Sequence, residues 1–142
     1  MRPINNDWEY LILKRIPAGG GFWQAVTGGV EDNEEYYQSA VRELREETGF
    51  APDKIEPVDY SYTFPVDPQM RKLYDQPVET ITEVVFLARI KPGIDPTLDP
   101  IEHDDWKWCD FDEAVRTVYW PGNKESLSAC RRHLRRDDHR SP

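Results

Sequence analysis

The chain has 142 residues and a formal net charge of −9, with 38% hydrophobic and 32% charged residues. This length suits one domain with a hydrophobic core and is too short for two ordinary domains, so we expect residues 1–142 to form a single domain. The acidic balance argues against a passive nucleic-acid-binding protein, which would need a basic face for the phosphates.

The first third of the chain reads as a strand, a turn and a helix. Trp8 to Ile16 is rich in apolar and aromatic residues and predicts a strand. Phe22 to Val26 is a short apolar segment that leads into the turn signal Thr27–Gly29. Residues 34–48 contain no Gly or Pro and carry apolar residues at helical spacing. Gly49 then suits the left-handed position that ends a helix.

The rest of the chain alternates strands, loops and helices. We expect the following segments: strands at Val58–Phe64, Glu79–Ile90 and Trp106–Cys109, a loop at Pro65–Pro77, and helices from Phe111 to about Tyr119 and from about Lys124 to Arg135. Residues from about 135 to 142 are arginine-rich and are expected to form a flexible tail. Interspersed helices and strands with a long central strand predict an α/β domain, with helices packed on a mixed sheet.

Three glutamates on the first helix carry the strongest chemical signal. At about 100° per residue, Glu43, Glu46 and Glu47 fall in one sector. The neighbouring sector is apolar and consists of Tyr37, Ala40, Val41, Leu44 and Thr48. Like charges at this spacing repel by a few tenths of a kcal/mol per pair, and a hard cation held by oxygen ligands would offset that repulsion. A solvated acidic face is the ordinary alternative for a glutamate-rich helix.

The sequence around this helix favours a bound cation over a solvated acidic face. Residues 28–50 read GGVEDNEEYYQSAVRELREETGF and resemble the Nudix box, G-x5-E-x7-R-E-U-x-E-E-x-G-U, where U is a bulky apolar residue. The matching residues are Gly28, Glu34, Arg42, Glu43, Leu44, Glu46, Glu47, Gly49 and Phe50. Asn33 stands where many members have glycine, and asparagine tolerates left-handed backbone angles. The resemblance to the Nudix hydrolase superfamily implies a mixed β-sheet sandwiched between α-helices.

The resemblance also implies a metal site. Box glutamates of Nudix enzymes coordinate Mg²⁺ or Mn²⁺, which makes Glu43, Glu46 and Glu47 the expected ligands. The carbonyl of Gly28 is expected to join them. A divalent cation would also suit the chemistry, because an acidic protein that handles phosphates needs a positive charge near them.

Further roles follow from the same resemblance. Arg42 corresponds to the box arginine, which orients neighbouring carboxylates by charge-assisted hydrogen bonds. Glu34 corresponds to the leading glutamate, whose role is more structural than catalytic. Glu43 is a candidate general base. The family often adds an acidic residue from a later loop as ligand or base, and Glu102 is our candidate, with a solvated loop glutamate as the alternative.

A second resemblance concerns the substrate. The run FWQAVTGGVE at residues 22–31 is similar to the lead-in of dihydroneopterin triphosphate pyrophosphohydrolases, once described as dATP pyrophosphohydrolases. It implies that Trp23 and Gln24 contact a base or pterin, although core aromatics are an equal alternative for the tryptophan. Lys14 and Arg15 end the first strand and are candidates for contacts with phosphates.

The leading hypothesis is a Mg²⁺-dependent hydrolase that cleaves a nucleoside or pterin triphosphate and releases pyrophosphate. A dinucleoside polyphosphate or capped-RNA pyrophosphohydrolase is the alternative, and a non-catalytic nucleotide-binding module is the alternative of another class. We expect a cytoplasmic protein, because the sequence shows no secretory signal, no membrane span and only two cysteines. We expect it to be a monomer or a homodimer.

Met1 to Asp7 supplies almost none of the apolar strand that family members carry there. Either the sheet lacks an edge strand or the true start lies upstream.

Overall fold

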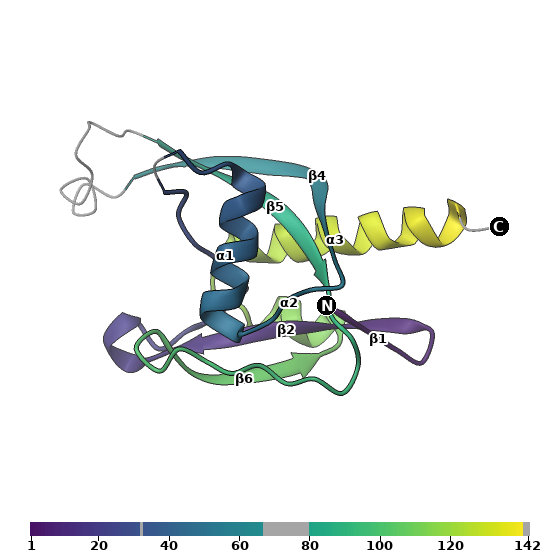
Figure 1. Cartoon of the computed structure of the whole chain (residues 1–142), viewed down its shortest axis with the longest axis horizontal. Coiled ribbons are helices and arrows are strands. Elements are labelled where there is room, and N and C mark those ends of the chain that lie inside the picture. The colour runs from purple at the N-terminus through teal and green to yellow at the C-terminus, as the bar shows by residue number, and fades with distance from the viewer. Residues whose placement is uncertain (32, 67–79, 141–142) are drawn as a thin grey trace.

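A computed structural model describes residues 1–31, 33–66 and 80–140 (Figure 1). Its elements are β1 (Arg2–Ile4), β2 (Asp7–Arg15), the 3-10 turn η1 (Pro17–Gly19), β3 (Trp23–Gln24), α1 (Tyr36–Thr48), β4 (Lys54–Pro65), β5 (Thr80–Arg89), β6 (His103–Cys109), α2 (Phe111–Thr117) and α3 (Pro121–Arg140). The loop expected at Pro65–Pro77 and the expected strand start at Glu79 lie largely outside the described residues.

Strand β2 is the centre of the four-stranded sheet, where it pairs antiparallel with β1, β3 and β6. Leu13 of β2 lies opposite both Gln24 of β3 and Trp106 of β6, so these two strands flank β2 on its two sides. Strands β4 and β5 form a separate antiparallel ribbon. The Ile90 N–H donates to the Met1 carbonyl oxygen at 2.8 Å, which links the end of this ribbon to the chain entering β1.

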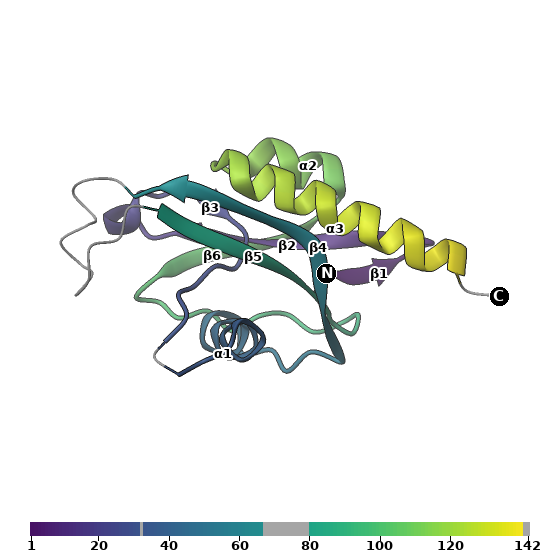
Figure 2. The same ribbon diagram turned by 90° about the horizontal axis from the view of Figure 1, so that it is seen from above.

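The strands lie between two layers of helix. Figure 2 shows α1 on one side of the strands and α2 with α3 on the other. Side chains of β2 pack beneath both helix layers, because successive side chains of a strand point to opposite faces. Tyr10 and Ile12 are buried in the core beneath α2 and α3, whereas Leu11 packs with Leu44 and Phe50 on the α1 side. This arrangement confirms the predicted class, an α/β sandwich of the Nudix type.

Two expectations about the chain ends need correction. A short edge strand is present, because β1 pairs with β2 from Arg2 opposite Glu9 to Ile4 opposite Asp7. Its hairpin turn uses Asn5 and Asn6 at positive φ, 42° and 61°, which asparagine tolerates. The strand is hard to predict because it is short and polar.

The last helix also runs further than expected. Instead of ending near Arg135, α3 continues to Arg140. Leu134 is buried, and Asp137 accepts a hydrogen bond from Arg89 of β5 at 2.7 Å. This ion pair holds the end of α3 against β5, although the composition of the segment predicted a flexible tail. None of the helices that the structure describes is long and apolar enough to cross a membrane.

Candidate active site

The box helix α1 has well-defined ends, which fix the direction of its glutamates. Glu35 precedes its first residue, and the Glu35 N–H donates to Gln38 Oε1 at 3.0 Å. At the other end Gly49 adopts φ 74°, and its N–H donates to the Arg45 carbonyl at 2.8 Å. Asn33 adopts φ 62° in the turn before the helix. This is the left-handed angle expected at a position where glycine is common, and asparagine tolerates it.

Arg42 ties the loop before α1 to the helix itself. Its Nε and Nη2 atoms donate to the two carboxylate oxygens of Glu34 at 2.8 and 3.0 Å. Nη2 also donates to the Gly29 carbonyl at 2.8 Å, while Nη1 donates to Glu43 at 3.0 Å and to Glu46 at 3.1 Å. Hydrogen bonding to Arg42 lowers the pKa of Glu34 to about 2. One guanidinium therefore orients three carboxylates and a loop carbonyl.

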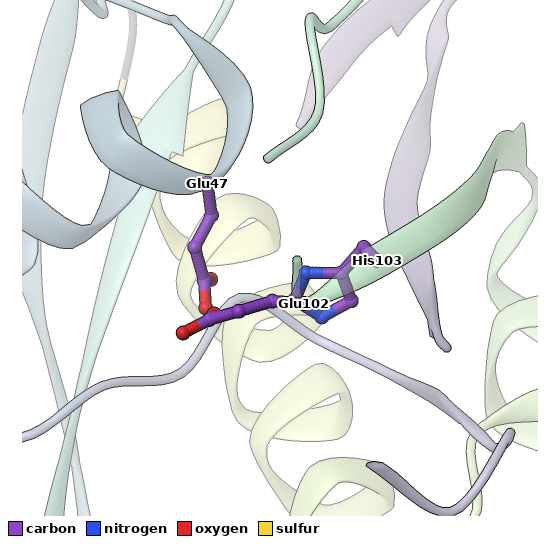
Figure 3. Close-up of side chains that lie close together, drawn as sticks. All are labelled: Glu47, Glu102 and His103. Carbon is purple, nitrogen blue, oxygen red and sulfur yellow. The ribbon is translucent and has the colours of Figure 1, made fainter. Parts of the chain in front are cut away.

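A buried carboxylate cluster lies at the C-terminal half of α1. Glu47 is only 3% exposed, and one ligand atom from each of Glu47, Glu102 and His103 lies within 4.8 Å of the others. Figure 3 shows the carboxylate ends of Glu47 and Glu102 pointing toward each other, with the His103 ring beside Glu102. Burial first, and then the neighbouring Glu102, raises the pKa of Glu47 to about 9. Within the described part of the chain, Oε2 of Glu47 has no hydrogen-bond partner.

Glu43 faces the same cluster and is pressed against the glycine loop. Its charge contributes to the raised pKa of Glu47 after that of Glu102, and its own pKa is raised by burial. A Cβ added at Gly28 would lie 2.0 Å from Glu43 Cδ, far inside van der Waals contact. Only glycine allows the loop backbone to approach the carboxylate this closely.

The cluster has the chemistry of a cation site. Buried carboxylates with like-charged neighbours and an unpaired oxygen are costly unless a positive charge compensates them. The available donors are carboxylate oxygens, which suit a hard divalent ion, and the Gly28 loop lies beside them. Burial lowers the pKa of His103 and so favours its neutral ring, whose Nε2 atom accepts from the Gln24 amide. The residues present therefore fit a bound divalent cation.

The structure brings together most of the residues that the sequence singled out. Glu43, Glu47 and Glu102 lie close enough for their charges to interact, and Gly28 lies against Glu43. Glu46 lies further out, with a side chain that is 55% exposed and hydrogen-bonded to Arg42.

The strand residues predicted to bind substrate divide between the two faces of the sheet. Gln24 is buried and joins His103 through a hydrogen bond of 3.0 Å between their Nε2 atoms. Arg15 pairs with His103 across β2 and β6 and lies on the same face. Trp23 instead packs against the core beneath α2, and its register partner Lys14 points the same way. The structure thus places Gln24 and Arg15 beside the cluster, and Trp23 and Lys14 on the opposite face.

His103 also belongs to the cluster, although no motif in the sequence marks it as a site residue. It is fully buried, with 0% exposure. The flanking residues Glu102, Asp104 and Asp105 are polar, so composition gives no sign of burial. A strand prediction extended back from Trp106 would have placed His103 and Glu102 at the strand start, which is the available signal.

Comparisons with known proteins agree with this geometry. The family model described as the NUDIX domain matches residues 3–130. An RNA pyrophosphohydrolase from Erythrobacter litoralis is 32% identical over 142 residues, which covers 92% of this chain and 85% of that protein. The structure of the E. coli dihydroneopterin triphosphate pyrophosphohydrolase superposes with a TM-score of 0.67 at 25% identity, over 89% of this chain and 87% of that one.

One further relative is much longer than this chain. An octanoyltransferase from Myxococcus xanthus is 32% identical over 117 residues, which is 82% of this chain but 30% of that protein.

A sheet sandwiched between helices, with a glycine loop and an acidic helix on one side, defines the Nudix class of domain. This chain belongs to the Nudix family.

Proposed function

We propose that this protein is a Mg²⁺-dependent hydrolase that cleaves a phosphoanhydride bond in a nucleotide-like substrate. The observation that carries the proposal is the buried Glu47 carboxylate, which faces Glu102 and His103 and has an oxygen with no partner among the described residues. Such a group is expensive in a structural core and useful where a cation and phosphates bind. Glu47, Glu43, Glu102 and the Gly28 carbonyl would hold the ion.

A bound ion would supply neutralising charge for the phosphate oxygens and would lower the pKa of the attacking water. Glu43 is our candidate for the base that takes the proton from that water. Burial raises its pKa above the ordinary value of a glutamate, while Arg42 holds its Oε1 atom in place at 3.0 Å. Mn²⁺ has the same preference for oxygen ligands and is expected to replace Mg²⁺.

The substrate we favour is a nucleoside or pterin triphosphate, which would be hydrolysed to the monophosphate and pyrophosphate. The pterin is supported by the structural likeness to the E. coli dihydroneopterin triphosphate pyrophosphohydrolase. Capped RNA is the second candidate, supported by the relative from Erythrobacter litoralis. Arg15 lies beside His103 and is suited to contact a phosphate. A non-catalytic binding module has less support, because the chain keeps Glu43, Glu46 and Glu47.

A turnover assay tests the proposal. Phosphate release is measured with added pyrophosphatase, in Mg²⁺ and in EDTA, on dATP, other nucleoside triphosphates, dihydroneopterin triphosphate, diadenosine tetraphosphate, ADP-ribose and triphosphorylated RNA. We expect metal-dependent turnover of a triphosphate, and signal only when pyrophosphatase is present. The Glu47→Gln variant should be inactive, whereas Glu125→Gln on the exposed surface of α3 should be normal. A folded wild-type protein that turns over nothing on this panel would refute the proposal.

A further inference from the structure

Three aromatic side chains form an exposed platform beside β3, defined by Phe22, Tyr119 and Trp120. Phe22 and Tyr119 stack with ring centroids 5.1 Å apart and an angle of 25° between their planes. Trp120 meets Phe22 edge-on at 5.3 Å and Tyr119 at 4.9 Å. Tyr119 is 60% exposed and Trp120 is 47% exposed. Clustered aromatic rings with this much free surface are typical of a binding site rather than of a core.

The backbone beneath the aromatic platform is firmly held. The Tyr119 N–H donates to the Trp23 carbonyl at 2.9 Å. Asn123 is buried, and its Oδ1 atom accepts a hydrogen bond from the Ala25 N–H at 2.9 Å. These bonds fix the segment before α3 to β3, so the rings are arranged before any ligand arrives and binding orders little of the protein.

The aromatic platform lies on the same face of the sheet as the carboxylate cluster. Trp23 points into the core beneath α2, so its neighbours Phe22 and Gln24 point to the opposite face, where Gln24 meets His103. Tyr119 follows the buried Val118 and stacks on Phe22 on that face. The path from β6 through β2 and β3 to the segment at Tyr119 crosses three strand spacings, about 14 Å.

A positive charge lies between these two ends. Arg15 pairs with His103 on one side, and its N–H donates to the Phe22 carbonyl at 2.9 Å on the other. Its guanidinium packs against η1, where a Cβ on Gly19 would lie 2.8 Å from Nε. Nε is buried and has no hydrogen-bond partner among the residues described. The positive charge of the guanidinium favours an anionic group nearby.

The carboxylate cluster, Arg15 and the aromatic platform therefore follow one another across the sheet. The carboxylates suit a cation with its phosphates, the guanidinium suits a further anionic group, and the platform suits a planar ring. We propose that the aromatic platform binds the planar heterocyclic ring of the substrate, with Tyr119 and Trp120 as its specificity-determining residues. The inference rests on the proposed function, since it assumes that the phosphate end occupies the carboxylate cluster. It adds where the heterocyclic ring of that substrate binds and that stacking of the ring contributes to affinity.

Binding of probes that cannot be hydrolysed tests the inference apart from catalysis. Isothermal titration in Mg²⁺ compares α,β-methylene-dATP, which carries a ring, with methylenediphosphonate, which does not. We expect the wild-type protein to bind the ring-bearing probe more tightly. The double variant Tyr119→Leu/Trp120→Leu should lose about tenfold or more of that affinity, the usual scale of base stacking, and none for methylenediphosphonate.

Two matched variants separate stacking from general damage. Trp120→Phe keeps a ring and should retain most of the affinity, whereas Tyr36→Leu removes a similarly exposed aromatic at the start of α1 and should change nothing. The inference is overturned if the wild-type protein binds both probes equally well. It is also overturned if the double variant, folded by its thermal transition, keeps wild-type affinity for α,β-methylene-dATP. Neither outcome depends on turnover, so the hydrolase proposal stands or falls separately.

Discussion

Replacing Glu47 by glutamine should make the metal-free protein more stable while destroying its activity. The pKa of this buried carboxyl is raised from 4.5 to about 9. At pH 7 the carboxyl is ionised in the unfolded chain but protonated in the fold, and linkage puts the resulting penalty on the folded state at roughly 3 kcal/mol. Glutamine keeps the shape of the side chain and cannot ionise, so Glu47→Gln removes that penalty.

The pH dependence follows from the direction of the shift. Below about pH 4.5 the carboxyl is protonated in both states and costs nothing. The penalty grows as the pH rises from 4.5 toward 9 and is constant above that value. Metal-free wild type should therefore lose stability across this interval, while Glu47→Gln should lose much less. Mg²⁺ should cancel most of this difference at pH 7, because saturation to a hundred times its dissociation constant stabilises the wild-type fold by about 2.7 kcal/mol.

Urea unfolding at pH 5, 7 and 9 measures these differences, with each protein in EDTA and in Mg²⁺. Glu46→Gln is the matched control, since it makes the same change on the same helix at a side chain that is 55% exposed. It should shift the free energy of unfolding by no more than about 0.5 kcal/mol at any of these pH values. A Glu47→Gln protein that is less stable than wild type in EDTA at pH 7, or that Mg²⁺ stabilises as strongly, would refute the reasoning.

Three other changes test the site. Gly28→Ala forces a Cβ to 2.0 Å from Glu43 Cδ, so kcat should fall at least a hundredfold. Circular dichroism should show an intact fold. Normal kinetics would contradict the close approach of the loop to Glu43. Arg42→Lys keeps the charge but loses the two-pronged hydrogen bond to Glu34, and we expect kcat/KM to drop about tenfold or more, measured against the unchanged far-UV spectrum. Glu102→Gln should reduce kcat by about a hundredfold or more with a small change in KM, and an effect below threefold would remove this residue from the site.

Local sequence rules were enough to locate the box helix and the turns at its two ends. Gly49 ends α1 in the left-handed conformation expected of it, and Asn33 takes the positive φ that its position requires. Glu43 and Glu47 share a sector because helical geometry is regular. These features depend on residues close together in the chain, so the sequence could predict them.

Features that depend on distant pairing could not be predicted in the same way. Lys14 and Arg15 are adjacent and equally charged, yet only Arg15 faces the cluster, because the register of β2 with β6 decides which side each takes. The end of α3 depends on an ion pair between Asp137 and Arg89, which are 48 residues apart. His103 lies against Gln24 of β3 and close to Glu47 of α1, so its burial depends on segments far apart in the chain.

Strand β2 also divides the consequences of mutation by position. Tyr10 and Ile12 pack in the core beneath α2, Leu11 packs in the core on the α1 side, and Arg15 ends the strand beside His103. Substitutions at Tyr10, Leu11 and Ile12 should therefore cost stability, whereas a substitution at Arg15 should alter the candidate site. One residue inserted ahead of Arg15 would turn its side chain to the opposite face, away from His103. This end of β2 should therefore tolerate substitution at Arg15 better than a change in length.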